Sequence, residues 1–190
     1  MKRTDIKRLT IRAFFVALVA LLGLTPLGLI PLGFINVTVL CIPVITGALY
    51  MGVRGGLILG FAFGTVSTMS MLGLSMTQPS MLASTLFASS PVLALIMCYA
   101  PRLMVPLTAL WVFRRFGDRK IAVPAAALVG SLTNTVLYLG LMLLFYILCG
   151  LDAKPIIGLI LGTGLLGGGS EAIVAAILVP PILSALKKVE

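Results

Sequence analysis

Long apolar segments alternate with short polar segments along the whole of this 190-residue chain. A helix of about 20 apolar residues crosses the hydrocarbon core of a membrane, and six segments approach or exceed that length. The pattern predicts membrane-spanning helices over residues 9–24, 36–51, 55–74, 92–113, 121–148 and 156–186. We therefore expect an all-α membrane protein in which residues 1–190 form a single bundle of six helices.

Breaker-rich, polar or charged segments separate the predicted helices. Proline and glycine occupy positions 26, 28, 31 and 33 between the first two helices, and Arg54 marks a tight turn before the third. The stretch 75–90 is polar but uncharged, so we expect an external loop there that folds back into the protein. Asp152 and Lys154 mark a second external turn, between the fifth and sixth helices.

Basic residues cluster at the ends of the predicted helices, in residues 2–12, 114–120 and 187–188. Cytoplasmic loops of membrane proteins are enriched in Lys and Arg, so these clusters place both termini and the 114–120 loop in the cytoplasm. In this arrangement thirteen of the fourteen basic residues lie on the cytoplasmic side or within a helix, and Lys154 alone lies outside. An even number of crossings follows, in agreement with six helices.

The composition is that of a membrane protein, and it narrows the possible activities. Hydrophobic residues make up 60% of the chain and charged residues only 10%. The basic loops explain the net charge of +9, so we expect no nucleic-acid partner. The chain has no histidine and no phosphate-binding GxxxxGKS/T motif, and its three cysteines follow no metal-ligand spacing. We therefore expect a protein that is not an enzyme and binds no metal or cofactor, which leaves binding, conduction or transport.

Two charged residues, Arg102 and Glu171, fall inside predicted helices. A charge at membrane depth is costly, so such a residue is a candidate for a functional site. Arg102 precedes Arg114, at the cytoplasmic end of the fourth helix, by twelve residues. At about 1.5 Å per residue this separation is roughly 18 Å, slightly beyond the midplane of a hydrocarbon core about 30 Å thick. At that depth the guanidinium needs an anion, carbonyl groups or a wet cavity.

Small residues recur at helical spacing in two of the predicted helices. Ala13 and Ala17 share one face of the first helix, and glycines occupy positions 52, 56, 60 and 64 in the third. Small residues let helices approach closely in lipid, so each face is a candidate for docking on a partner subunit. Packing among the protein's own helices is the alternative for both faces.

An ordered set of segments runs through most of the chain. It comprises the Ala-x-x-x-Ala motif at Ala13 and Ala17, LIPLGFINVTVLCIPVITGALYMGVRGGLILGFAFG from residue 29, SPVLALIMCYAPRL from residue 90, SLTNTVLYLG from residue 131 and EAIVAAILVPPILSAL from residue 171. Together these segments resemble the substrate-binding (S) components of energy-coupling factor (ECF) vitamin transporters. Residues 34–64, the Pro101-Arg102 pair and the Asn134-Thr135 pair are most similar to the pantothenate branch of that family.

The resemblance implies a transporter subunit of the bacterial plasma membrane that captures a water-soluble vitamin. Its first three helices, with Ala13 and Ala17 facing outward, would dock on a transmembrane coupling subunit. Two cytoplasmic ATPases would complete the ECF module and consume the ATP. The external loops and the outer halves of helices four to six would hold the vitamin, and the S component would topple in the membrane to carry it inward.

Pantothenate has one carboxylate, one amide and two hydroxyl groups, and the chain offers a partner for each. Arg102 can bind both carboxylate oxygens through its planar guanidinium. Asn134 and Tyr138 share one face of the fifth helix, beside Thr133, and can bind the amide and hydroxyls. The remaining candidates are polar residues expected near the outer face, namely Glu171, Gln78, Ser90 and Asn36.

Each of these assignments has a structural alternative. Arg102 can pair with Glu171 inside the protein, Asn134 can form an interhelical hydrogen bond, and Tyr138 can serve in packing. Two other functions also stay open at this point. One is an S component for a different vitamin or precursor, and the other is a structural or channel-like membrane subunit without a high-affinity ligand.

Overall fold

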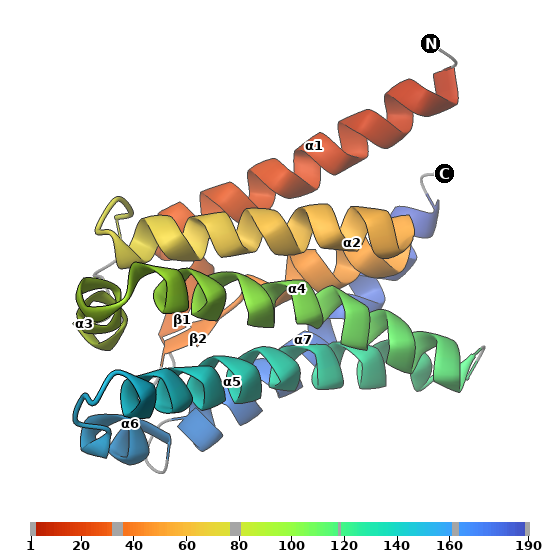
Figure 1. Cartoon of the computed structure of the whole chain (residues 1–190). Coiled ribbons are helices and arrows are strands. Elements are labelled where there is room, and N and C mark those ends of the chain that lie inside the picture. The colour runs from red at the N-terminus through yellow and green to blue at the C-terminus, as the bar shows by residue number, and fades with distance from the viewer. Residues whose placement is uncertain (1–2, 32–35, 77–80, 118, 161–163, 189–190) are drawn as a thin grey trace.

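A computed structural model describes residues 3–31, 36–76, 81–117, 119–160 and 164–188 (Figure 1). The elements in chain order are α1 (Arg3–Leu24), the 3₁₀ helix η1 (Pro26–Gly28), β1 (Leu29–Pro31), β2 (Asn36–Thr38), α2 (Cys41–Met71), α3 (Met81–Ser89), α4 (Pro91–Phe116), α5 (Ala122–Leu148), α6 (Lys154–Leu159) and α7 (Leu165–Lys188). The predicted helical fold is confirmed. Four of the described helices are long and apolar enough to cross a membrane: Cys41–Met71, Pro91–Phe116, Ala122–Leu148 and Leu166–Lys188.

α2 consists of two helical arms, residues 41–51 and 53–71, that meet at Gly52. This glycine has φ 76° and ψ −168°, a conformation that side-chain-bearing residues rarely adopt. The chain folds back there, because a Cβ atom added to Gly56 of the second arm would lie 2.9 Å from Cβ of Ala48 in the first. Figure 1 shows the two arms side by side. The turn predicted at Arg54 therefore lies at Gly52, which is not part of the packed glycine face.

The other glycines of the four-residue repeat pack within the bundle. A Cβ atom added to Gly60 would lie 2.6 Å from the backbone oxygen of Arg102, and one added to Gly64 would lie 2.5 Å from the ring of Tyr99. Gly56 is equally close to a side chain of α4. Each glycine thus allows the second arm of α2 to approach α4 more closely than any larger residue would permit. Internal packing accounts for this face.

α4 lies at the centre of the bundle and packs against α2 and α5, while α7 packs against α5 and α1 against α2 (Figure 1). The start of α1 and the end of α7 lie at the same end of the bundle. The short helices α3 and α6 lie at the opposite end. This arrangement defines an α3 end and a terminal end of the molecule.

Three predicted ranges differ from the structure. The second helix was expected to begin at residue 36, but residues 36–38 form the strand β2. This strand pairs antiparallel with β1, with Pro31 opposite Asn36, and α2 begins only at Cys41. β-Branched residues in both strands favour this extended backbone. The stretch 75–90, expected to be a loop, contains the helix α3. The range 156–186 is covered by α6, which begins at Lys154, and by α7, which ends at Lys188, and residues 161–163 between them lie outside the described residues.

Two groups of buried apolar side chains hold the helices together. The aliphatic cluster contains no methionine among its fully buried members, which are Phe15, Val19, Leu40, Cys41, Ile42, Val44, Ile45, Leu59, Phe63, Val66, Val105, Ala109, Val112, Ala126, Ala127, Ala175 and Val179. The sulfur-rich cluster comprises Met71, Ala83, Leu86, Ala94, Met97, Cys98, Met142, Phe145, Tyr146 and Ile156. Since the second cluster includes residues of α3 and α6, it lies toward the α3 end.

Candidate ligand-binding site

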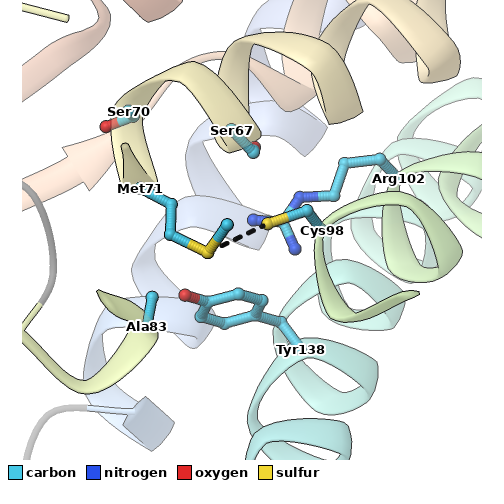
Figure 2. Close-up of a pocket in the computed structure, with 7 residues that line it drawn as sticks. All are labelled: Ser67, Ser70, Met71, Ala83, Cys98, Arg102 and Tyr138. Atoms are coloured by element: carbon cyan, nitrogen blue, oxygen red, sulfur yellow. Dashed lines mark hydrogen bonds between the residues drawn. The ribbon is translucent and has the colours of Figure 1, made fainter. Parts of the chain in front are cut away.

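A cavity of about 130 Å³ lies between α2, α3, α4 and α5 (Figure 2). Its walls are formed by Ser67, Ser70, Met71, Ala83, Cys98, Arg102 and Tyr138. The lining combines one cation with hydroxyl groups and two sulfur atoms, and it contains no carboxylate. Such a lining favours a small anionic ligand that also carries hydrogen-bonding groups.

Among the described residues that line the cavity, Arg102 is the only charged side chain, and it is 8% exposed. Its Nη1 donates a hydrogen bond to the carbonyl oxygen of Met97 at 3.3 Å, whereas its Nε is buried without a partner in the described part of the chain. The guanidinium carbon lies 4.4 Å from the ring centroid of Tyr138 and 5.3 Å from that of Phe63. Both rings are within the range of cation–π attraction. The cation is therefore oriented by its neighbours, and its buried Nε keeps a hydrogen-bond donor without a partner among the described residues.

Pro101 explains why the Met97 carbonyl is available to Arg102. In a regular helix this carbonyl would accept a hydrogen bond from the N–H of residue 101, but proline has no N–H. The guanidinium of the next residue reaches back and supplies a donor in its place. A carbonyl group and a cavity thus meet two of the needs expected of a cation at membrane depth.

α5 forms the wall beside Arg102. Tyr138 lines the cavity, and Asn134 lies one turn earlier on the same face with only 8% of its surface exposed. The Oδ1 atom of Asn134 is buried without a hydrogen-bond partner among the described residues. Thr133 differs, because its hydroxyl donates to the Val129 carbonyl of its own helix at 2.7 Å. Asn134 therefore has more capacity for a ligand than Thr133.

α2 and α3 form the opposite wall, as Figure 2 shows. Ser67 is half-buried and makes no hydrogen bond within the described ranges, while Ser70 accepts one from Ser75 at 3.1 Å. The thiol of Cys98 lies 4.0 Å from the sulfur of Met71. This wall places one available hydroxyl and the Met71 sulfur across from the guanidinium, while the Cys98 thiol lies on α4, one turn before Arg102.

α3 is held over the cavity by one strong hydrogen bond. The hydroxyl of Tyr146 on α5 donates to the carbonyl oxygen of Leu82 at 2.6 Å. The next residue, Ala83, is buried and lines the cavity. The position of this wall therefore depends on a contact between α3 and α5.

Comparison with known proteins identifies the family. The model of the ECF transporter substrate-specific component matches residues 7–183. The chain belongs to this family. It is also 29% identical to the pantothenic acid transporter PanT of Lactococcus lactis subsp. cremoris (strain MG1363), over 99% of this chain and 97% of the relative. The resemblance seen in the ordered segments is thereby confirmed, and the protein is a multi-pass membrane protein that acts in transport.

The structure brings only part of the predicted site of this S component together. Arg102 and Tyr138 line the cavity, and Asn134 lies one turn away. Glu171 is half-buried on α7 and does not line the cavity. It lies close enough to Cys41, at the start of α2, to act on it electrostatically, as does Arg102. The predicted pairing of Arg102 with Glu171 stays a prediction.

The other predicted residues either do not line the cavity or lie outside the described part of the structure. Ser90 precedes the first turn of α4 and does not line the cavity. Asn36 is in β2, but its side chain lies outside the described part of the structure, as does the whole of Gln78. On α1, Ala13 and Ala17 are both exposed to the surroundings of the bundle.

Sequence reasoning missed most of the α2 wall. The glycine repeat at positions 56, 60 and 64 continues on the same helical face to Ser67 and Met71. Extending the repeat by two turns would have placed these two residues opposite α4. Phe63 and Cys98 carry no comparable signal, because isolated apolar residues in a membrane helix are most often packing residues.

Proposed function

We propose that this S component captures pantothenate and delivers it inward when docked on an ECF module. The proposal rests above all on Arg102, a buried cation in the wall of a cavity whose Nε has no hydrogen-bond partner among the described residues. A buried charge without a full set of partners is costly, and a bound carboxylate would supply them. The similarity to a pantothenic acid transporter supports this ligand.

The other groups of pantothenate also find partners around the cavity. Tyr138 and Ser67 offer hydroxyl groups, and Asn134 offers an amide that can donate and accept. The present volume of about 130 Å³ is below the roughly 300–1,000 Å³ typical of small-molecule sites. Ligand entry would therefore displace lining side chains, and Met71 has the flexibility to move.

The membrane arrangement that we propose has six crossings and cytoplasmic termini. The crossings are α1, the two arms of α2, α4, α5 and α7. The fold-back at Gly52 supports two crossings within α2, and the common end of α1 and α7 supports an even number. The basic residues Arg114 and Arg115 in the last turn of α4, and Arg119 and Lys120 after it, belong to the terminal side of the bundle, in agreement with the enrichment of Lys and Arg in cytoplasmic loops.

Titration calorimetry on the purified protein tests the ligand. We expect one pantothenate molecule to bind, and Arg102→Ala to weaken binding about 100-fold, because a charge-assisted hydrogen bond contributes roughly 1.5–3 kcal/mol. Arg102→Lys should fall in between, since it keeps the charge but loses the planar pair of donors. Arg54→Ala is the matched control, because Arg54 is exposed beside the Gly52 turn.

This experiment tests the ligand assignment independently of the family assignment. Absence of heat with pantothenate, together with a clear signal from another vitamin, would disprove the pantothenate assignment and leave the family unaffected. Binding that survives Arg102→Ala would disprove the proposed role of this arginine.

Docking on the module involves a different part of the molecule. We propose that the exposed face of α1 around Ala13 and Ala17 contacts the transmembrane coupling subunit, which works with two cytoplasmic ATPases. Ala13→Trp or Ala17→Trp should abolish co-purification with the coupling subunit and leave pantothenate affinity unchanged. Val136→Trp is the control, because Val136 is 66% exposed on α5, away from α1. Loss of ligand binding with intact assembly would contradict this division of labour.

A further inference from the structure

We infer that Gly60 and Phe63, on the second arm of α2, are positioning residues that set the Arg102 guanidinium in the orientation required for a ligand carboxylate. This inference rests on the proposed capture of pantothenate. Neither residue lines the cavity, so both would act through Arg102 and not by touching the ligand. Three features of the α2–α4 contact support this role.

The first feature is the close approach of the two backbones at Gly60. A Cβ atom added to Gly60 would lie 2.6 Å from the backbone oxygen of Arg102 and 3.3 Å from Cα of Leu103. These are backbone atoms, so the clash cannot be relieved by rotating a side chain. Any larger residue at position 60 would have to displace α4 at the residue that carries the guanidinium.

The second feature is the carbonyl group that Gly60 faces. The residue four positions after Arg102 is Pro106, which has no N–H to donate to that carbonyl. The helix is therefore weakened on both sides of Arg102, because Pro101 likewise deprives the Met97 carbonyl of its backbone donor, and the Arg102 side chain replaces it. A helix that lacks internal hydrogen bonds at this point relies on its neighbour for its path, and Gly60 of that neighbour packs directly against the Arg102 carbonyl.

The third feature is the ring of Phe63, 5.3 Å from the guanidinium carbon. Phe63 is 5% exposed and belongs to the aliphatic cluster, where it packs among side chains with few rotamers. The ring of Tyr138 lies nearer to the guanidinium, at 4.4 Å, and contacts the sulfur-rich cluster. Phe63 thus ties the guanidinium to the rigid part of the core, whereas Tyr138 belongs to the cavity itself.

The spacing of these residues joins the features into one surface. Gly60, Phe63 and Ser67 recur at intervals of three and four residues, so they share one face of α2. On this face, Gly60 packs against the α4 backbone, the Phe63 ring contacts the guanidinium, and Ser67 lines the cavity. Binding both carboxylate oxygens through one guanidinium requires a defined plane, and a misplacement of about 1 Å at a site of this kind can reduce activity about 100-fold.

Comparison of pantothenate with its alcohol analogue, in which CH₂OH replaces the carboxylate, tests this inference. The ratio of the two affinities measures how well Arg102 engages the carboxylate, and a general loss of stability would lower both affinities alike. We expect Gly60→Ala to weaken pantothenate binding about tenfold or more, with at most about a threefold change for the alcohol. Gly140→Ala should behave as wild type, because an added Cβ there meets nothing within 4 Å.

Phe63→Leu provides a second variant that keeps most of the apolar volume and removes the ring. It should reduce the affinity ratio about threefold to tenfold, as expected for the loss of a buried cation–π contact. Phe61→Leu is its control, because Phe61 is 58% exposed and its ring contacts Tyr99 instead of Arg102. If Gly60→Ala does not fold, this pair of variants decides the question.

The possible outcomes distinguish the two proposals. If the wild-type protein does not prefer pantothenate over the alcohol, both the proposed ligand and the positioning role are overturned. If the wild-type protein shows that preference and a folded Gly60→Ala or Phe63→Leu variant retains it in full, only the positioning role is overturned.

Discussion

The aliphatic and sulfur-rich clusters are two hydrophobic cores built from different kinds of side chain. In the aliphatic cluster, valine and isoleucine join α1, α2, α4, α5 and α7, and their branched side chains have few rotamers. In the sulfur-rich cluster, Met71, Met97, Met142 and Cys98 occupy the region around the cavity. Methionine has three rotatable side-chain bonds and fills irregular space. The chain therefore combines a rigid frame with an adaptable wall.

Arg102 lies at the boundary between the two clusters. Phe63, on one side of the guanidinium, is a member of the aliphatic cluster, and Tyr138, on the other, packs against the sulfur-rich cluster. A group that must meet a carboxylate in a defined orientation benefits from attachment to the rigid side. A ligand that must enter a small cavity benefits from side chains that can move.

The largest effect on stability is expected in the aliphatic cluster. Ile45 is fully buried there, so Ile45→Ala should lower the free energy of unfolding by about 2–5 kcal/mol. Reversible unfolding in mixed micelles measures the change. Ile58→Ala is the control, because Ile58 is 45% exposed and should lose far less. Equal losses for the two variants would show that the aliphatic cluster is not a rigid core.

An intermediate effect is expected where α3 is tied to the bundle. Tyr146→Phe removes the hydrogen bond to the Leu82 carbonyl, which contributes about 1 kcal/mol. Since Ala83 lines the cavity, we expect pantothenate to dissociate about fivefold faster in a stopped-flow or surface-binding experiment. Tyr99→Phe is the control, because it loses a hydroxyl contact with Thr65 and does not involve α3. An unchanged dissociation rate for Tyr146→Phe would mean that α3 does not limit ligand release.

The smallest effect is expected for a change of shape inside the sulfur-rich cluster. Met142 is 1% exposed, yet Met142→Leu should change the free energy of unfolding by less than about 1.5 kcal/mol. Val44→Leu, an enlargement at a fully buried position of the aliphatic cluster, should cost about 1–3 kcal/mol. The same unfolding experiment compares them. A larger loss for Met142→Leu would remove the distinction between the two clusters.

Much of the helical organisation was predictable from the pattern of apolar residues. The ranges 92–113 and 121–148 lie within or close to α4 and α5, because long uninterrupted apolar segments have few alternatives. Predictions were wrong where breakers are dense. The strands β1 and β2 and the helix α3 occur in such stretches, where local propensities are weak and neighbouring elements decide the backbone.

The candidate site was predicted only in part, because charge and helical spacing are visible in the sequence but contacts between helices are not. Arg102 was conspicuous as a charge inside a helix, and Asn134 and Tyr138 followed from their shared face on α5. The α2 wall was not predicted, because glycine, serine and phenylalanine in a membrane helix resemble ordinary packing residues. Only the contact between α2 and α4 gives Gly60 and Phe63 their relation to Arg102.

The pattern of apolar and charged residues was enough to indicate the helical membrane fold, the family and the unusual position of one cation. Hydrophobicity and charge are properties of single residues, and the membrane sorts them without reference to distant parts of the chain. The tertiary structure decided which helix faces meet, and with them the environment of Arg102. The orientation of the guanidinium depends on contacts between residues far apart in sequence. Gly60 and Arg102 are one such pair, since a Cβ atom added to Gly60 would lie 2.6 Å from the Arg102 carbonyl oxygen.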